Sequence, residues 1–294
     1  MSWKYFLPLC LLLTLFACAA CQSRTQTPAA PRQFDSQRAY QDIVNQMQFG
    51  PRIPASTAHQ SAVDYIQTEL QKAGWQVEIQ KATYQEHPVE NILAKRRQSK
   101  NPIILGAHYD SRMSADQDPN LALRSQPVPG ANDGASGVAV LLEIARVLPQ
   151  SDQNTWLVFF DSEDQGKLSN WDWLLGSTLF ADDLKVTPTA VVVIDMIGDS
   201  DLNIYREITS TKMLSDQIWQ TASDLGYSKQ FINQEKYSML DDQTPFLNKG
   251  IPAVDIIDFD YPYWHTTSDT LDKVSPASLE IVGKTLLAWL AKAQ

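Results

Sequence analysis

The sequence predicts an α/β fold: a three-layer α/β/α sandwich around a mostly parallel, twisted central sheet, in a single domain. Three apolar runs of strand length indicate buried parallel strands at residues 103–107, 156–160 and 190–194. Segments with apolar residues at helical spacing alternate with these runs, as expected when helices connect parallel strands. The chain shows no internal repeat, so a single domain is the simplest organisation.

Residues 1–21 resemble a lipoprotein-type signal peptide and are set apart from the fold. Lys4 precedes an apolar run that is too short to span a bilayer comfortably. The end of this run resembles the bacterial lipoprotein cleavage box, in which Cys18 or Cys21 would become the lipid-bearing first residue, and Leu15 favours Cys18. An ordinary cleaved signal is the alternative. We expect an exported lipoprotein with its catalytic domain outside the cytoplasm, and the membrane that holds the anchor stays open.

Residues 22–38 are rich in Gln, Ser, Thr, Pro and Arg without an apolar period, which predicts a flexible tether. All three cysteines, Cys10, Cys18 and Cys21, precede this segment. The remaining domain, residues 39–294, therefore has no cysteine for a disulfide or a thiolate metal site. A net charge of -10 argues against a nucleic-acid partner, and we expect membrane contact only through the lipid anchor.

The elements of the domain follow from periodicity. A first helix is predicted to start near Ala39, and a second covers residues 57–73, with Gly74 as its stop. Strands are predicted at 76–79 and 91–94 and then at 103–107, followed by a long polar loop at 111–128 and a buried helix at 138–148. The remaining elements are strands at 156–160, 190–194 and 253–257 and helices at 212–225, 245–248 and 276–293.

Acidic residues and histidines follow several of these strands and turns. They are His108, Asp133, Glu163, Asp164, Asp195 and His265. Because open α/β sheets place ligands at the carboxyl ends of their strands, we expect these side chains to converge. Any one of them could instead be a helix cap or a turn residue. The prediction of a metal site therefore depends on several of them occurring at strand ends and turns in the same chain. Neutral histidine and carboxylates suit zinc, and one of the pair Glu163 and Asp164 could bind metal while the other serves as a general base.

Five segments then carry a resemblance to a known family. They are GAHYDS at 106–111, GANDGASGVAVLLEIARVL at 130–148, FFDSEDQG at 159–166, VVVIDMIGD at 191–199 and YWHTTSDTLD at 263–272. The chain resembles peptidase family M28, a zinc aminopeptidase superfamily, and is most similar to its bacterial glutaminyl-peptide cyclotransferase (glutaminyl cyclase) branch. The resemblance runs over about residues 40–292.

The resemblance implies roles for individual residues. It implies that Asp133, Asp164 and His265 hold a zinc ion, that Glu163 is the acid/base, that Asp195 and Asp241 are supporting carboxylates, and that Trp264 lines the substrate pocket. In two-metal aminopeptidases of the family, the positions matching His108 and Asp195 bind a second zinc, with the position of Asp133 as the bridge. The resemblance thus implies one zinc ion for a cyclotransferase and two for an aminopeptidase.

Three features favour the cyclotransferase branch. The pair Glu163 and Asp164 stands where aminopeptidases usually have two glutamates, and an insertion at 167–175 carries Trp171 and Trp173. Asp241 stands where aminopeptidases usually have serine. Two departures are Gln243, where both groups commonly have histidine, and the absence of the disulfide found in animal cyclases.

The expected function is therefore conversion of an N-terminal glutamine of peptides or proteins to pyroglutamate, with release of ammonia. A zinc aminopeptidase that hydrolyses N-terminal residues is the alternative, followed by a metal-binding lipoprotein without turnover. Peptide or protein N-termini are the expected partners, and the natural substrate and the oligomeric state stay open.

Overall fold

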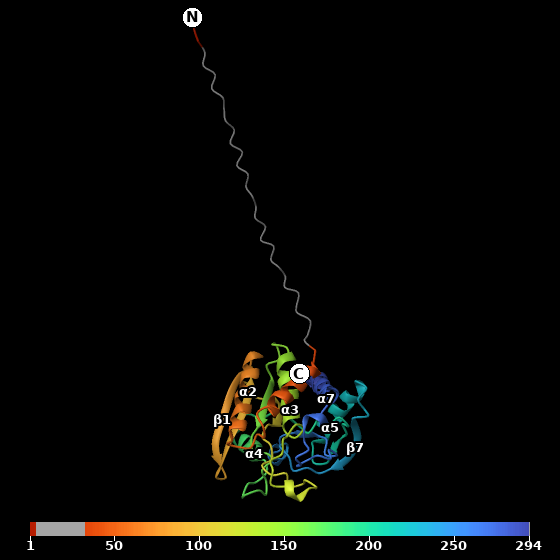
Figure 1. The fold of residues 1–294 in the computed structure, drawn as a ribbon. Helices are drawn as coiled ribbons and strands as arrows, with labels where there is room; N and C mark the ends of the chain where they lie inside the picture. The colour runs from red at the N-terminus through yellow and green to blue at the C-terminus, as the bar shows by residue number, and fades with distance from the viewer. Residues whose placement is uncertain (4–32, 294) are drawn as a thin grey trace. The chain divides into compact units, whose positions relative to one another are not determined.

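A six-stranded sheet forms the middle layer of the computed structural model, which describes residues 1–3 and 33–293 (Figure 1). The strands lie in the order β1-β2-β4-β3-β5-β8. Their bounds are β1 Gln76–Tyr84, β2 His87–Lys95, β3 Ile103–His108, β4 Thr155–Phe160, β5 Ala190–Asp195 and β8 Ala253–Ile257. Strands β4, β3, β5 and β8 are mutually parallel, whereas β2 runs antiparallel to both of its neighbours. The predicted mostly parallel sheet is confirmed.

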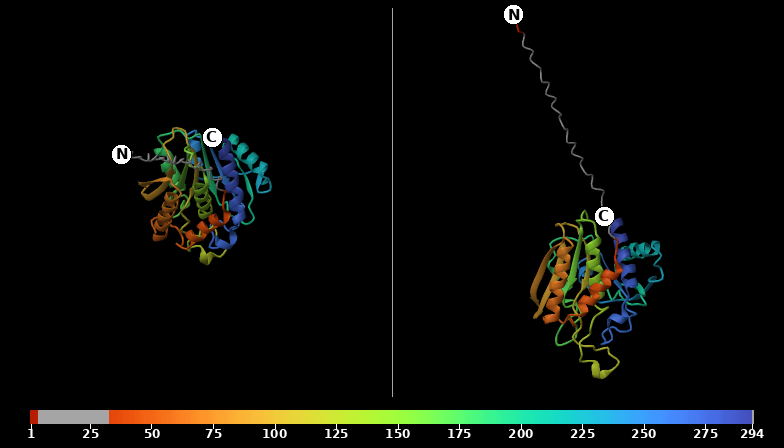
Figure 2. Two further views of the ribbon diagram at one scale, coloured as in Figure 1. Left: turned by 90° about the horizontal axis from the view of Figure 1, so that it is seen from above. Right: turned by 45° about the horizontal axis from the view of Figure 1, so that its top comes forward.

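Helices cover both faces of this sheet (Figure 2). One face packs against α1 Ser36–Met47, α2 Thr57–Lys72, α3 Ala135–Val147 and α7 Pro276–Ala293. The other packs against α4 Leu175–Asp183 and α6 Thr244–Asn248. Helix α5, Lys212–Asp224, packs beside α7 and beside a small parallel sheet of β6 Ile204–Glu207 and β7 Phe231–Tyr237. The three-layer α/β/α sandwich in a single domain is confirmed.

The central strands are apolar throughout because both of their faces are covered. In β3, Ile103 and Leu105 belong to the core under α1, α2, α3 and α7, whereas Ile104 belongs to the core under α4 and α6. All six residues of β3, of β4 and of β5 are buried. Continuous burial explains why these strands read as unbroken apolar runs rather than as alternating patterns.

The structure differs from the sequence prediction at the start of the domain. Helix α1 begins at Ser36 rather than near Ala39, because the Asp35 side chain accepts hydrogen bonds from the Gln37 and Arg38 amides and so caps it. Phe34 is also buried, at 7% exposure, in the same core as α1 and α7. The tether predicted at 22–38 therefore ends by residue 34, and the rest of it, with the leader, lies largely outside the described residues.

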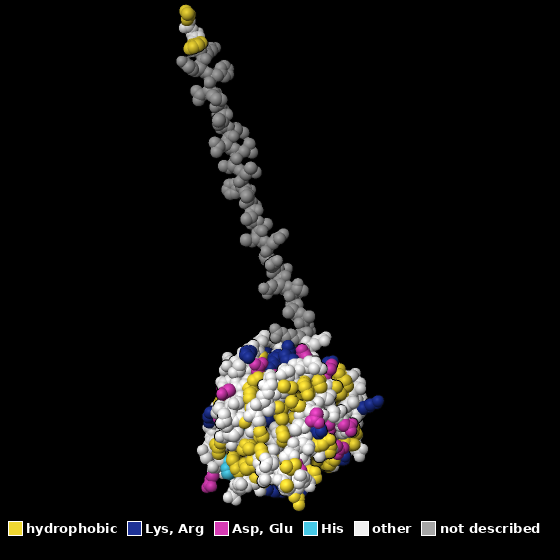
Figure 3. All heavy atoms as spheres, in the orientation of Figure 1, with side chains coloured by type: hydrophobic (Ala, Val, Ile, Leu, Met, Phe, Trp, Pro, Cys, Tyr) yellow, Lys and Arg dark blue, Asp and Glu magenta, His cyan; other side chains and the backbone are white. Residues whose placement is uncertain are grey.

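Three elements were not predicted: α4, β6 and β7. Strand β7 is mostly exposed, so it lacks an apolar pattern, and β6 has only four residues. No helix in the described part of the chain combines the length and apolar character needed to cross a membrane. On the face in Figure 3, acidic, basic and apolar side chains are interspersed.

Candidate metal centre and catalytic cavity

The carboxyl ends of four parallel strands meet at one edge of the central sheet. His108 is the last residue of β3 and Asp195 is the last residue of β5. Glu163 and Asp164 lie in the turn after β4, and His265 lies in the loop after β8. Asp133 lies just before the start of α3, which follows β3. The topology thus brings the predicted side chains to one edge, as expected for an open α/β sheet.

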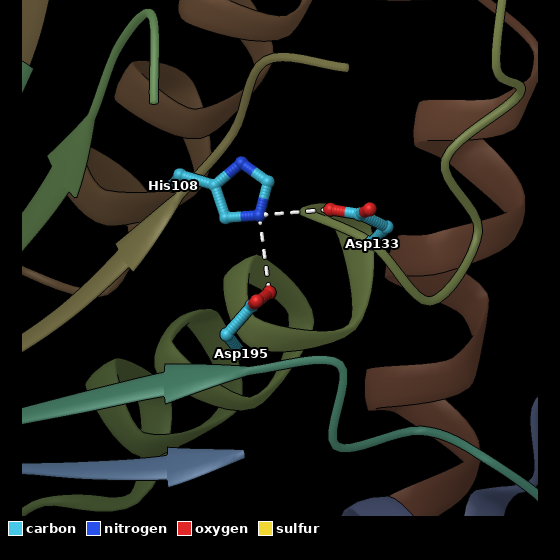
Figure 4. Close-up of side chains that lie close together, drawn as sticks. All are labelled: His108, Asp133 and Asp195. Atoms are coloured by element: carbon cyan, nitrogen blue, oxygen red, sulfur yellow. Dashed lines mark hydrogen bonds and ion pairs between the residues drawn. The ribbon is translucent and has the colours of Figure 1, made fainter. Parts of the chain in front are cut away.

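Two groups of buried side chains there have spacings that could hold a metal ion. In the first, His108 Nε2 lies 3.1 Å from Asp133 Oδ1 and 3.1 Å from Asp195 Oδ1 (Figure 4). In the second, His265 Nε2 lies 2.8 Å from Asp164 Oδ1 and 3.8 Å from Asp133 Oδ2. Each Asp133 oxygen faces a different histidine, so this carboxylate is shared by both groups.

The chemistry of these donors fits zinc. Imidazole nitrogen and carboxylate oxygen are ligands that zinc accepts, and each group offers three of them. Asp133 Oδ2 and Asp164 Oδ2 are buried and accept no hydrogen bond. A buried carboxylate oxygen without a donor carries a desolvation cost that a bound cation would offset. The residues present therefore fit a zinc ion in either group.

Asp133 is held in place by contacts to its backbone. The Asp269 carboxylate accepts hydrogen bonds from the Asn132 and Asp133 amides at 2.8 and 3.1 Å, and it also accepts one from the Tyr261 hydroxyl. Gly134 follows with φ of +86°, and a Cβ there would lie 2.6 Å from the carbonyl oxygen of Asp110. Only glycine tolerates this close, left-handed turn, which aims Asp133 at the two histidines.

A buried arginine supports the same loop. Arg52 donates hydrogen bonds to the carbonyl oxygens of Tyr109, Pro129 and Gly130, at 2.6–3.1 Å. Burial lowers the pKa of Arg52, while the nearby Asp269, Asp110 and Asp133 carboxylates oppose that shift. A guanidinium bound to carbonyl oxygens fixes the path of the chain on both sides of the loop and adds positive charge beside an acidic site.

The turn that carries Glu163 and Asp164 is held by Asp110. The Asp110 carboxylate accepts hydrogen bonds from the Glu163 and Asp164 amides, at 3.1 and 3.3 Å, and from the Gln165 side chain at 2.9 Å. Asp110 Oδ1 also lies 3.4 Å from His108 Nδ1, without a hydrogen bond between them. One carboxylate two residues after His108 therefore sets the position of the β4 turn relative to the end of β3.

Four of the five residues in the metal groups, all except His108, line a cavity of about 240 Å³. Its lining includes Glu163, Asp195, Asp241, Trp173 and Trp264. The Trp264 ring stacks on the His265 ring with their centroids 3.8 Å apart, and the Trp173 ring lies nearly parallel to the His265 ring at 6.1 Å. The cavity is thus lined by both acidic groups and aromatic rings, which suits a small substrate group with a polar end.

Burial and mutual repulsion shift the protonation of the acids in this cavity. The pKa of Glu163 is well above its ordinary value because the carboxyl is buried and because Asp164 and Asp241 lie close, although His108 opposes the shift. The pKa of Asp241 is also well above its ordinary value, through burial and through Asp195 and Asp242. Two neighbouring carboxyls with raised pKa values can share a proton and pass it on.

The two histidines are more basic than usual in the metal-free site. Burial lowers the pKa of His265, but Asp164, Asp116 and Asp133 outweigh it and raise the value to about 9. The pKa of His108 is well above its ordinary value because Asp195, Asp110 and Asp133 likewise outweigh burial. Zinc binding to either group must therefore displace a proton from the imidazole.

The structure brings the predicted site residues together, whereas two other residues named in the sequence analysis, Trp171 and Gln243, lie outside the cavity lining. Trp171 stacks on His87 at the turn between β1 and β2, with ring centroids 3.8 Å apart, whereas Trp173 lines the cavity. Gln243 is buried and donates a hydrogen bond to the carbonyl oxygen of Met239.

Sequence reasoning missed the supporting residues Asp110, Asp269, Arg52, Arg112 and Asp116. Asp110 and Asp269 lie inside two of the segments that carry the resemblance, so their proximity to His108 and His265 was a usable signal. Arg52 lies outside these segments, and no feature of the sequence pointed to its role.

Comparisons with known proteins identify the family of the chain. Residues 91–290 match peptidase family M28. The chain belongs to peptidase family M28.

Similar proteins of the family are named either as glutaminyl cyclases or as zinc-dependent exopeptidases and aminopeptidases. The glutaminyl cyclase of Porphyromonas gingivalis is 34% identical with a TM-score of 0.83, over 89% of this chain and 99% of that one. A leucine aminopeptidase precursor from Bacteroides thetaiotaomicron is 31% identical with a TM-score of 0.83, over 88% and 97% of the two chains. The glutaminyl-peptide cyclotransferase of the snake Boiga irregularis is 27% identical over 81% of this chain and 76% of its own. The chain is thus similar to both M28 glutaminyl cyclases and M28 zinc exopeptidases.

Proposed function

We propose that this M28 protein is a glutaminyl-peptide cyclotransferase, which converts an N-terminal glutamine to pyroglutamate and releases ammonia. The observation that carries the proposal is the presence of Asp241 in the cavity, which it lines together with Glu163, Asp195 and the aromatic rings of Trp173 and Trp264. Cyclisation needs a proton to move between two nitrogens of one substrate residue, and a set of neighbouring carboxyls with raised pKa values supports such a transfer.

In the proposed reaction, the substrate's α-amine nitrogen forms a bond to its own side-chain amide carbon, and the bond from that carbon to the amide nitrogen breaks. Glu163 takes a proton from the attacking nitrogen and returns it to the leaving nitrogen, which departs as ammonia. Asp241 keeps the proton affinity of Glu163 high through the proximity of like charge, and Asp195 acts on Asp241 in the same way. Trp264 and Trp173 enclose the substrate side chain and exclude water, which this reaction does not consume.

Zinc bound by Asp133, Asp164 and His265 would act as a Lewis acid on the side-chain amide carbonyl. These three residues are the group that shares the cavity with Trp264 and Glu163. The second group, of His108, Asp133 and Asp195, gives the alternative function some support, because a zinc exopeptidase of this family would use two ions. In that case Glu163 would take a proton from a water molecule that attacks the peptide carbonyl.

One experiment separates the two functions. The purified, zinc-loaded protein is incubated with a glutamine-initiated peptide and a leucine-initiated peptide, and the products are read by mass spectrometry. Loss of ammonia from the first peptide, with the second intact, supports the cyclotransferase. Release of leucine, without ammonia loss above the spontaneous rate, would instead establish the exopeptidase.

We also propose that the protein is exported and held at a membrane by a lipid on Cys18 or Cys21. The support is the leader sequence alone, since residues 4–32 lie outside the described structure. Labelling of the full chain in cells with a palmitate analogue tests the proposal, with Cys18→Ser and Cys21→Ser as paired variants. Label lost in only one variant identifies the anchor, and a chain that takes up no label has none.

A further inference from the structure

A single buried arginine connects several parts of the candidate metal centre. Arg112 begins the long polar loop after β3, and its side chain is only 2% exposed. Its guanidinium donates a hydrogen bond of 2.7 Å to the carbonyl oxygen of Asp164 and lies 4.7 Å from the centre of the Trp173 ring. The same group is therefore in contact with the backbone of one candidate ligand and with a wall of the cavity.

The guanidinium also fixes a carboxylate beside the His265 ring. Arg112 Nε and a terminal nitrogen donate to the two oxygens of Asp116 at 2.8 and 2.9 Å, so the pair is bidentate. Asp116 Oδ1 in turn lies 3.5 Å from His265 Nδ1. Because Nε2 of the same ring faces Asp164 and Asp133, Asp116 lies on the side of the imidazole away from the candidate metal site.

The residues after Asp116 hold the backbone around His265. The Gln117 amide donates to the His265 carbonyl oxygen at 3.2 Å, and the Asp118 carboxylate accepts hydrogen bonds from the amide and hydroxyl of Thr267 at 3.0 and 2.7 Å. His265 has φ of +55°, in the left-handed region that a residue with a side chain rarely adopts. Such a conformation persists only where surrounding contacts determine it, and here this loop supplies them.

We propose that Asp116, clamped by Arg112, is a positioning residue that takes the Nδ1 proton of His265 as its hydrogen-bond partner and so presents Nε2 to zinc. A neutral imidazole carries its proton on one nitrogen and its lone pair on the other, and a carboxylate beside Nδ1 selects the form with the lone pair on Nε2. The rest of the loop holds the strained backbone of His265 so that this ring has one orientation. The inference rests on the proposed zinc centre, and it holds for a cyclotransferase or an exopeptidase alike.

The test measures metal binding rather than turnover. Zinc dissociation constants are determined by competition with a chromophoric chelator for the wild-type protein and for Asp116→Ala, and the visible absorption spectrum of the cobalt-loaded proteins is recorded. We expect Asp116→Ala to weaken zinc binding by about 10- to 100-fold, the usual effect of losing such an outer carboxylate. The cobalt spectrum should change as well, because a freed imidazole alters the ligand geometry.

Two further variants make the result decisive. Asp272→Ala removes an equal charge from a side chain that is 69% exposed, and it should bind zinc like the wild type. Asp116→Leu keeps a side chain of similar size without a hydrogen-bond acceptor, and it serves as the test if Asp116→Ala does not fold. A folded Asp116→Leu protein with the wild-type zinc affinity and cobalt spectrum would overturn the inference. A wild-type protein that binds no zinc would overturn the proposed metal centre itself, and the inference with it.

Discussion

Glu163 and Asp164 are adjacent in the chain, but their carboxyl groups have different surroundings. Asp164 Oδ1 lies 2.8 Å from His265 Nε2, and burial outweighs this contact and raises the pKa of Asp164 to about 6. Glu163 lies beside Asp164 and Asp241, and burial together with these like charges raises its pKa well above the ordinary value. Two neighbouring carboxyls with separate surroundings suit separate roles, one as a ligand and one as an acid/base.

This difference predicts opposite results for two substitutions. Glu163→Gln should bind zinc like the wild type and lose about 10²- to 10⁴-fold in kcat, because the amide cannot carry the proton. Asp164→Asn should instead lose zinc affinity, since it removes a charged donor from the group with Asp133 and His265. Zinc content by atomic absorption and the initial rate of ammonia release are measured for both. Wild-type turnover in Glu163→Gln would remove this residue from the proposed role.

Asp241 should control the pH at which Glu163 works. Its negative charge contributes to the raised pKa of Glu163, so Asp241→Asn should lower that pKa. Because the base must be ionised to accept a proton, the acid limb of the profile of kcat/KM against pH should move to lower pH. The exposed Asp272→Asn is the control and should leave the limb where it is. An acid limb that stays in place, or moves to higher pH, in Asp241→Asn contradicts the proposed coupling.

At the scale of elements, the site depends on how closely α3 packs on the sheet. Gly137, in the first turn of α3, faces β3 and β5, and a Cβ at this position would lie 2.6 Å from the Ile194 carbonyl oxygen and 2.8 Å from the Ala107 Cβ. These two residues directly precede Asp195 and His108. Close packing of this helix therefore sets the distance between Asp133, at its start, and the ends of the two strands.

Gly137→Ala should accordingly push α3 away from the sheet. We expect it to lower the free energy of unfolding by about 1–3 kcal/mol, the usual cost of overpacking, and to weaken zinc binding as Asp133 moves. Chemical denaturation and chelator competition measure the two effects. Gly250→Ala is the control, because Gly250 has φ of +73° with nothing within 4 Å of an added Cβ, so only backbone strain acts there and zinc binding should not change. Equal zinc affinity in both variants would show that α3 does not set the site.

The strands and long helices could be predicted from the sequence because their burial leaves a periodic signal. The run at 103–107 and the structure's β3 differ by one residue, and β8 coincides with its prediction at 253–257. Strand β7 could not be predicted this way, since most of its side chains are exposed and their pattern carries no period. The start of α1 depends on a single capping side chain, Asp35. A capping residue is polar and leaves no mark in the spacing of apolar residues.

The candidate site was predictable where residues follow strands and unpredictable where loops support them. His108 and Asp195 end strands, so the sheet topology alone brings them together. Arg52 and Arg112 act through hydrogen bonds to backbone carbonyl oxygens, and such contacts depend on loop conformations that leave no period in the sequence.

At the scale of the whole molecule, the density of buried acids makes stability depend on pH. Burial raises the pKa of Asp242, Asp258 and Asp269 to about 7 in each case. Each of these groups, and Asp164, has a folded-state pKa above its unfolded value, so the stability that it contributes is lost as the pH rises through about 6 to 7. His265 acts in the same direction, because its contribution is lost as the pH rises through about 9.

The metal-free protein should therefore be more stable at pH 5.5 than at pH 8.5. We expect the melting temperature to fall by at least about 4 °C between these values, which corresponds to about 1–2 kcal/mol for a domain of this size. Differential scanning calorimetry of the protein with a chelator measures the fall, and excess zinc at pH 8.5 should reverse it, by about 4 kcal/mol at a thousand times the dissociation constant. Asp258→Asn, a substitution in neither metal group, should flatten the slope. A melting temperature that is constant or rises over this range contradicts the prediction.

The ligands of the two metal groups come from several separate strand ends and loops, and this affects how the protein folds. The ligand residues of the two metal groups lie at the ends of β3 and β5, in the loop before α3, in the turn after β4 and in the loop after β8. These segments come together only when the parallel strands have paired, and such non-local pairing is the slow part of folding. Zinc would then have no complete set of ligands until late on the folding pathway. Its binding should slow unfolding of the native protein and leave the rate of refolding nearly unchanged.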